Sequence, residues 1–192
     1  MTPRGRRAPV CAGRALLAFV LLALVAVPLL ADVYQDRRVE AGLKIFRALL
    51  AADLDLEKKT VDDGKLLVLF FYTDDARRAD DLGKTFGTDP IHGKPVLVEQ
   101  GTDAALASYA SRVPAGVFVA QPPSAASLRS LVAYGIQHHV IVYSPYEGHV
   151  ESGVLGGLVV EAQVRPYINM QTLGASHLNL KEFFLKVTKE YR

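Results

Sequence analysis

Cysteine and an excess of positive charge are both missing from the larger part of this sequence. The only cysteine among the 192 residues is Cys11, so residues 32–192 contain no thiol for a disulfide or for catalysis. The first 31 residues contain no acidic side chain and four basic ones, Arg4, Arg6, Arg7 and Arg14. Removing these leaves 18 basic and 20 acidic side chains in residues 32–192. The sequence therefore lacks the basic surplus expected of a nucleic-acid-binding domain.

Residues 1–31 have the layout of a secretory signal peptide. The arginines precede an uncharged apolar run at residues 15–31, Pro28 lies near the end of the run, and Ala31 is a small residue at a cleavage position. Leu29 is larger than the residue preferred three positions before the cut, so an uncleaved N-terminal membrane anchor is the alternative. In both cases residues 32–192 are expected in the periplasm or outside the cell.

Apolar patterns of helix and strand alternate along residues 39–192. Helical spacing predicts helices over residues 39–56, 75–86, 103–110, 124–134 and 179–191. Short apolar runs predict strands over residues 65–72, 95–99, 115–120, 139–143, 153–160 and 163–168. The last two strands, separated by a very short connection, are typical of an antiparallel hairpin. The pattern predicts one three-layer α/β domain with a mostly parallel sheet, a C-terminal antiparallel hairpin and a terminal helix.

Polar residues follow the predicted parallel strands, where ligands usually bind in an open α/β sheet. These strand ends are Thr73-Asp74-Asp75, Gln121-Pro122-Pro123 and Ser144-Pro145-Tyr146-Glu147. We take as candidate ligand or partner contacts Thr73, Asp74, Ser144, Tyr146 and Glu147. Asp74 and Asp75 have an alternative role as caps of the following helix. No glycine-rich phosphate loop and no Gly-x-Ser-x-Gly elbow occurs, so the sequence predicts no nucleotide, no cofactor and no catalytic residue.

The histidines raise the hypothesis of a metal-binding site, but their spacing in the sequence does not favour it. His138 and His139 are neighbours at the start of a predicted strand, and would point to opposite faces of the sheet. His149 and Glu147 could approach a common ion with His138, but the usual alternative is a set of surface or hydrogen-bonded histidines. We therefore predict no metal site.

The C-terminal third resembles a known family. The segment Gly153-Val-Leu-Gly-Gly-Leu-Val-Val-Glu-Ala-Gln-Val-Arg-Pro-Tyr-Ile-Asn169, followed by Leu173, Leu178 and a closing helix, is similar to the ending of the YfiR-like periplasmic proteins. Upstream, 66–71, 91–98 and 116–119 match the family's order of segments. The pair Ile168 and Asn169 is the specific part of this structural motif. The resemblance implies that Asn169 satisfies backbone groups where the last strand turns into a helix.

The resemblance also implies a function: members of this family modulate an inner-membrane signalling protein, typically a diguanylate cyclase with a periplasmic sensor domain. The chain departs from the family in two respects. It has no cysteine pair for redox control, and it lacks both tryptophan and the family's aromatic-proline stretch after the first helix.

Three hypotheses follow for the function. The leading one is an exported, non-enzymatic regulatory module that binds an inner-membrane diguanylate cyclase or sensor kinase, with a homo-oligomer also open. The second is a periplasmic small-solute-binding component of a transporter, with its pocket at Thr73, Asp74, Ser144 and Tyr146. The third is a hydrolase or metalloenzyme that uses His138, Glu147 and His149.

Overall fold

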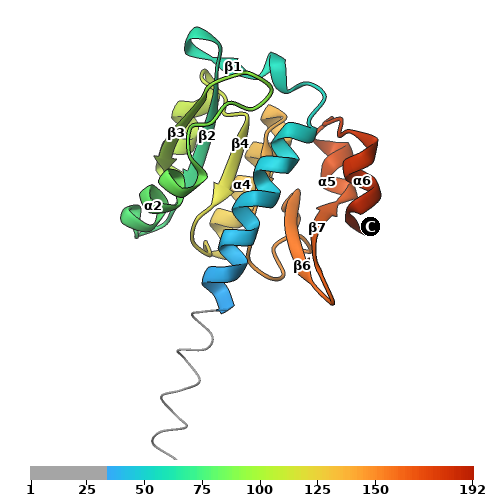
Figure 1. Ribbon diagram of the computed structural model, residues 1–192. Coiled ribbons are helices and arrows are strands. Elements are labelled where there is room, and N and C mark those ends of the chain that lie inside the picture. Colours follow the sequence, from blue (N-terminus) through green and yellow to red (C-terminus); the bar gives the residue numbers. More distant parts are fainter. Residues whose placement is uncertain (1–33) are drawn as a thin grey trace, which may run out of the picture. The chain divides into compact units, whose positions relative to one another are not determined.

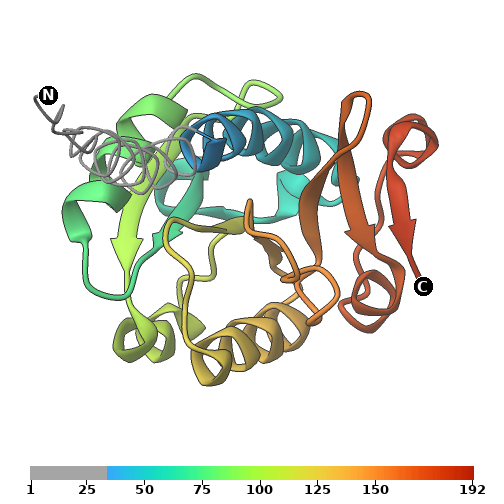
Figure 2. The same ribbon diagram turned by 90° about the horizontal axis from the view of Figure 1, so that it is seen from below.

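The computed structural model describes residues 34–192. The chain divides after Arg38, and the fold considered below is the unit Val39–Arg192. An eight-stranded sheet forms its central layer, with helices on both faces (Figures 1 and 2). The predicted signal peptide or anchor, residues 1–31, lies outside the described residues. Among residues 34–192, none of the helices has the length and apolar character needed to span a membrane.

The sheet has the predicted mixed arrangement. Its strands pair in the order β1-β2-β4-β5-β6-β7-β8, and β3 also pairs with β2. All pairs from β3 through β2, β4 and β5 to β6 are parallel, whereas β6 and β7 form an antiparallel hairpin. The bounds are β1 Thr60–Val61, β2 Lys65–Phe71, β3 Val96–Gly101, β4 Gly116–Val119, β5 Ile141–Tyr143, β6 Gly156–Val160, β7 Val164–Asn169 and β8 Lys189–Tyr191.

Helices cover the sheet from both sides. The N-terminal helix occupies residues 34–52, and from Val39 onward its buried residues pack on one face together with α2 and α6. The opposite face carries α3 and α4. The bounds are α2 Ala76–Phe86, α3 Asp103–Leu106, α4 Ala125–His138, α5 Met170–Ala175 and α6 Glu182–Val187. Short 3-10 turns cover Leu56–Lys58, Asp62–Gly64 and Ala107–Ala110.

Strand β2 is formed by an unbroken apolar run because both of its faces are covered. Leu66, Val68 and Phe70 pack against the cluster under the N-terminal helix, and the alternating residues Leu67, Leu69 and Phe71 pack against α4. Successive side chains of a strand point to opposite faces, so a strand covered on both sides has no polar position. This part of the prediction is confirmed.

The end of α4 differs from the prediction. The helix passes through Gly135 and ends at His138, because His139 adopts a left-handed conformation with φ 57°. Gly135 does not stop the helix; its missing side chain lets β5 approach, since a Cβ there would lie 2.6 Å from Val142 Cγ2. Strand β5 consequently starts at Ile141. The prediction that His138 and His139 are neighbours at the start of a strand is wrong, because both lie at the end of α4.

The C-terminal end also differs. The predicted helix over residues 179–191 is wrong: α6 covers only Glu182–Val187, and the chain then forms β8, which pairs in parallel with β7. Thr188 turns the chain, because its hydroxyl donates to the Phe184 carbonyl at 2.9 Å while its own backbone is extended. Helix α5, directly after β7, was not predicted.

Two other helix boundaries are corrected. The first helix ends at residue 52 and not at residue 56, and Asp53 forms an isolated bridge with Leu180. The predicted helix over residues 103–110 is α only to Leu106, and the Thr102 side chain does not cap it.

Candidate functional site

The strand order places a topological switch point between β2 and β4. From β2 the chain crosses through α2 to β3, and from β3 it returns through α3 to β4, which pairs with β2 in parallel. The connections therefore leave the carboxyl ends of β2 and β4 in different directions. In open α/β sheets such a point opens a crevice in which ligands bind. Here the corresponding position at the edge of the sheet is bordered by Thr73, Asp74 and Asp75 after β2 and by Gln121 after β4.

Three consecutive backbone N–H groups converge at this point on one oxygen atom. The Gln121 side-chain Oε1 accepts hydrogen bonds from the backbone N–H of Thr73 at 3.0 Å, of Asp74 at 3.3 Å and of Asp75 at 3.1 Å. Successive N–H groups directed at one point form a nest that favours an oxygen with negative partial charge. We call the three amides the amide cradle.

The other end of the Gln121 carboxamide is also held. Its Nε2 donates to Asp74 Oδ1 at 2.9 Å, so the amide pairs an acceptor with the cradle and a donor with a carboxylate. Asp75 has a different role, because its side chain accepts from the Arg78 backbone N–H at 3.0 Å and caps α2. The capping interpretation therefore holds for Asp75, whereas the Asp74 carboxylate accepts from Gln121.

Tyr146 and Arg78 complete the edge. The Tyr146 hydroxyl donates to the Ala120 carbonyl at 2.7 Å, and the Arg78 side chain approaches the same carbonyl at 3.4 Å. These contacts tie the loop after β5 and the first turn of α2 to the end of β4. Three of the five predicted site residues, Thr73, Asp74 and Tyr146, are thus brought to one edge of the sheet.

Ser144 does not contribute a contact surface. It is fully buried and its Oγ lies 2.7 Å from His149 Nδ1, while it also accepts from the Tyr146 backbone N–H at 3.2 Å. Its role is to hold the loop between β5 and β6 in place. Glu147 is exposed at the beginning of this loop. Tyr143, at the end of β5, is a core residue whose ring is stacked on Phe118 at 5.6 Å between ring centroids.

The surroundings of His149 favour the neutral form of its ring. Burial lowers the pKa of His149 below its ordinary value, and the nearby Glu151 carboxylate only partly opposes this effect. A neutral ring can accept the Ser144 hydrogen bond at Nδ1, whereas a protonated ring cannot.

This arrangement predicts a loss of stability in mild acid. As the pH falls below about 6.5, the unfolded chain binds a proton at His149 more readily than the folded chain does. The stabilisation is therefore complete above the unfolded-state pKa and is lost as the pH falls toward the lower folded-state pKa. The replacement His149→Asn keeps an acceptor near the Nδ1 position and removes the titration. Between about pH 7.5 and about pH 5.5 the melting temperature should fall less in this variant than in the wild type. Equal falls in the two proteins would contradict this role.

The Asn169 side chain makes two hydrogen bonds at the junction of β7 and α5. Its Nδ2 donates to the Val150 carbonyl at 2.9 Å, and its Oδ1 accepts from the Thr172 N–H, which caps α5. Thr172 Oγ1 donates to the Gly153 carbonyl at 2.8 Å. Together, these bonds fasten the loop before β6 to the strand-to-helix junction. Ile168 is buried in the core.

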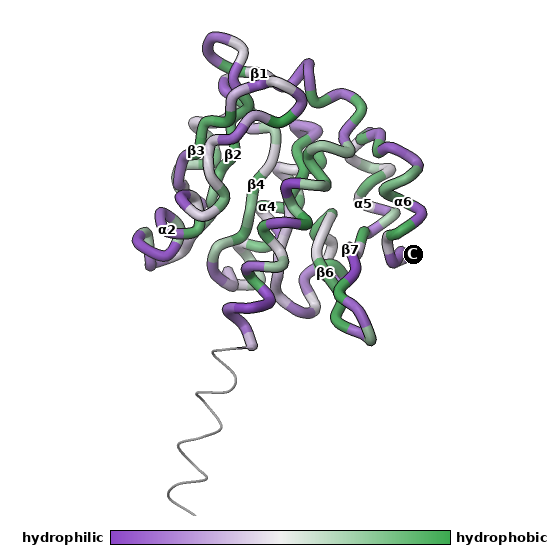
Figure 3. The backbone as a smooth tube through the Cα atoms, in the orientation of Figure 1, coloured by the Kyte–Doolittle hydropathy of each residue, from purple (hydrophilic) through white to green (hydrophobic). Residues whose placement is uncertain are grey.

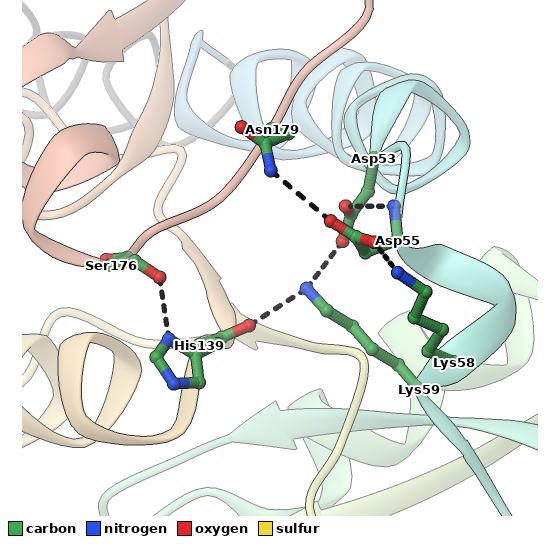
Figure 4. Close-up of polar contacts among 7 residues, drawn as sticks. All are labelled: Asp53, Asp55, Lys58, Lys59, His139, Ser176 and Asn179. Carbon is green, nitrogen blue, oxygen red and sulfur yellow. Dashed lines mark hydrogen bonds and ion pairs between the residues drawn. The ribbon is translucent and has the colours of Figure 1, made fainter.

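A second polar cluster lies at the amino end of the sheet (Figure 4). The buried Asp53 carboxylate accepts from Lys59 Nζ at 2.5 Å and from the Asp55 N–H at 3.0 Å. Lys59 Nζ also donates to the His139 carbonyl, and the His139 ring contacts the Ser176 carbonyl. The cluster therefore joins the end of the N-terminal helix, the end of α4 and the segment between α5 and α6.

A pocket of about 730 Å³ adjoins this cluster, and three of the side chains that line it, Lys58, Lys59 and Arg112, are positively charged. Its three permanent cations are already paired with carboxylates. Lys58 is bound to Asp55 at 2.5 Å, Lys59 to Asp53 at 2.5 Å, and Arg112 to Asp62 and Glu99 at 2.6 Å each. Because no positive charge is left uncompensated, we assign this region a structural role and not anion binding.

The histidines do not assemble a metal site. His138 packs on Tyr134 at the end of α4, before β5, whereas His149 lies after β5 at the opposite edge of the sheet. Within residues 34–192, no group of three or more metal-ligating side chains comes together.

The comparisons with known proteins bear on the fold. No protein-family model and no curated protein matches this chain. A conserved domain protein from Vibrio cholerae has the same fold, with a TM-score of 0.52 and 11% identity over 80% of this chain and 60% of that one.

Two further solved structures give lower scores. One is the ABC domain in complex with L-Trp from Streptococcus pneumonia, with a TM-score of 0.47 and 12% identity over 74% of this chain and 61% of that one. The other is an open, ligand-free substrate binding protein with adhesive properties from Clostridium difficile. Its TM-score is 0.49, and the identity is 13% over 73% of this chain and 60% of that one. This chain thus spans about three fifths of the length of each.

Sequence reasoning missed the central side chain of the site. Gln121 stood at a noted strand end, but one glutamine before two prolines carries no motif that distinguishes it from a surface residue. The usable signal was topological: only the strand order reveals that the ends of β2 and β4 are neighbours at a switch point.

Proposed function

We propose that this chain is a binding protein that takes up a small polar solute at the carboxyl edge of its sheet. The observation that carries the proposal is the amide cradle of Thr73, Asp74 and Asp75, located at the switch point between β2 and β4. The solute places an acceptor oxygen in the cradle, where Gln121 Oε1 lies in the free protein, and a donor nitrogen beside Asp74.

The Gln121 carboxamide indicates the class of solute. Its oxygen accepts hydrogen bonds from the cradle, and its nitrogen donates one to the Asp74 carboxylate. A solute that carries an oxygen acceptor close to an amino or amide donor can therefore replace it. The Asp74 carboxylate repels a purely anionic solute. Amino acids, primary carboxamides and small amines with a neighbouring carbonyl have the required pair of groups.

The geometry gives no support for turnover at this edge. The hydroxyl–imidazole pair of Ser144 and His149 is closed to a substrate because Ser144 is fully buried. A nucleophile must reach the reacting atom, so we propose recognition without chemical change.

A thermal-shift screen with free amino acids, primary carboxamides and small amines tests the proposal. A binding solute at about 100 times its dissociation constant should stabilise the protein by about 2.7 kcal/mol. Asp74→Ala removes a charge-assisted hydrogen bond and should weaken binding by about tenfold or more. Asp81→Ala, on the exposed side of α2, serves as the matched control and should bind like the wild type. A flat screen, or equal binding by the Asp74 and Asp81 variants, counts against the proposal.

Regulation of an inner-membrane signalling protein is the second candidate. It is supported by the sequence resemblance to the YfiR-like proteins, whose Asn169 position here carries the two hydrogen bonds of the β7–α5 junction. A pull-down of the protein from membrane extract at several salt concentrations tests it. Recovery of a membrane cyclase or sensor kinase would support regulation, and recovery of none above background would remove this candidate.

A further inference from the structure

A second surface, distant in sequence from the amide cradle, exposes large apolar side chains. Among the residues described, two pairs stand out near the C-terminus: Val160 and Val164 are 41% and 47% exposed, and Phe183 and Val187 are 65% and 56% exposed. We call these four residues and the elements that carry them, the β6–β7 hairpin and α6, the hairpin–α6 surface. Exposed apolar side chains that gather in one place mark interaction sites more often than single ones do.

Polar contacts link the two elements that carry these pairs. Val160 and Val164 are register partners beside the turn of the hairpin, so they share a face of the ladder. Phe183 and Val187 are four residues apart on α6 and share a helix face. Arg165 connects the two elements, because its guanidinium donates to the Val187 carbonyl at 3.5 Å and to the Thr188 carbonyl at 3.3 Å.

The charge around this surface has the opposite sign to that of the rest of the fold. Residues 181–192 contain four basic and two acidic side chains, whereas residues 34–180 contain 14 basic and 17 acidic ones. The basic side chains here, with Arg165 from the hairpin, are Lys181, Lys186, Lys189 and Arg192. Three glutamates lie among them and pair with Lys186, Lys189 and Arg192. A positive excess therefore surrounds the exposed apolar side chains.

The shape of this surface favours a soft, extended partner over a rigid segment inserted in a groove. The hairpin extends beyond its neighbouring strands and carries hydrophobic residues in both arms (Figure 3). The three described pockets are lined by other residues, none of them from the hairpin or α6. Segments that lie in the headgroup region of anionic membranes typically carry projecting apolar side chains with Lys and Arg side chains nearby.

We propose that the hairpin–α6 surface docks on the surface of an anionic phospholipid bilayer. Phe183 and Val187 enter the interface between headgroups and acyl chains, and Val160 and Val164 contact it from the hairpin. Lipid phosphates pair with Lys181 and Arg165 and compete with the glutamates for Lys186, Lys189 and Arg192, whose ion pairs are exposed and weak. Docking does not involve the amide cradle, so it is independent of solute binding.

The absence of tryptophan from the whole sequence allows a direct test on the full chain. Phe183→Trp places a single fluorophore on the surface, and Ala133→Trp places one on the exposed side of α4, on the other face of the sheet. Vesicles with equal parts of phosphatidylglycerol and phosphatidylcholine should shift the emission of the first variant to shorter wavelength. Nitroxide-labelled lipid should quench it, and the Ala133→Trp emission should not change. Because each tryptophan reports its own surroundings, membrane binding by another part of the chain does not produce this difference.

The charge requirement is tested separately. Adding Lys186→Glu to the Phe183→Trp protein should raise the lipid concentration for half-maximal response by about tenfold, since each basic residue near an anionic surface contributes about 1 kcal/mol. About 0.5 M salt should weaken the response, and pure phosphatidylcholine vesicles should give little of it. An identical response of the two tryptophan variants, or an equal response to both kinds of vesicle, would overturn the proposal. An emission shift that needs no vesicles and grows with protein concentration would also overturn it, because it would assign this surface to a second copy of the chain.

Discussion

Replacing Lys59 with methionine is expected to lower the free energy of unfolding by about 3 kcal/mol or more. The variant keeps the length of the side chain but leaves the Asp53 carboxylate, which is fully shielded from solvent, without its cation. A charge left unpaired in a buried position is strongly destabilising, and here it also weakens the link to the His139 carbonyl. Urea denaturation followed by circular dichroism measures the effect.

Lys58→Met is the matched control for this experiment. Lys58 precedes Lys59 directly and also pairs with an aspartate, but its side chain is 81% exposed. Surface ion pairs contribute about 0–1 kcal/mol, so the control should be almost as stable as the wild type. If the two methionine variants lost the same stability, the Asp53–Lys59 pair would not hold the amino end of the fold together.

The second large effect is expected at Asn169. Asn169→Ala removes both the donor to the Val150 carbonyl and the acceptor of the Thr172 N–H, in a position that is 3% exposed. Each buried group left without a partner costs about 1–3 kcal/mol, so we expect a loss of about 3 kcal/mol in the free energy of unfolding.

Two further variants separate the contributions at this junction. Asn169→Asp keeps the acceptor for α5 and loses the donor, and should fall between the wild type and the alanine variant. Asn179→Ala removes an exposed asparagine whose single side-chain bond to Asp55 is 3.4 Å long, and should cost less than about 1 kcal/mol. A near-normal stability of Asn169→Ala would contradict the assigned role.

The sequence predicted the features that depend on burial. Continuous apolar runs identified the buried parallel strands, and the short connection between two strands identified the hairpin, because both patterns follow from which faces are covered. Asn169 was singled out by the resemblance to a family and not by a burial pattern.

Features that depend on tertiary contacts were not predictable in the same way. Gly135 has the usual signature of a helix end, yet it lies inside α4 because Val142 needs the space of its missing side chain. Residues 189–191 have no strong strand pattern, and they form β8 because the edge of β7 offers hydrogen bonds. The site residues were found only in part, because Gln121 meets Thr73 and Asp74 through the strand order and not through any local motif.

The central claim is that a solute occupies the amide cradle at the end of β2. Nuclear magnetic resonance of the ¹⁵N-labelled protein tests it most directly, by titration with the strongest stabiliser from the thermal-shift screen. The account predicts that the backbone amides of Thr73, Asp74 and Asp75 and the side-chain amide of Gln121 shift together with one dissociation constant, while the amides of Lys59 and His139 keep their positions. Shifts confined to the amino end of the sheet, or unchanged cradle amides at saturating solute, would contradict it.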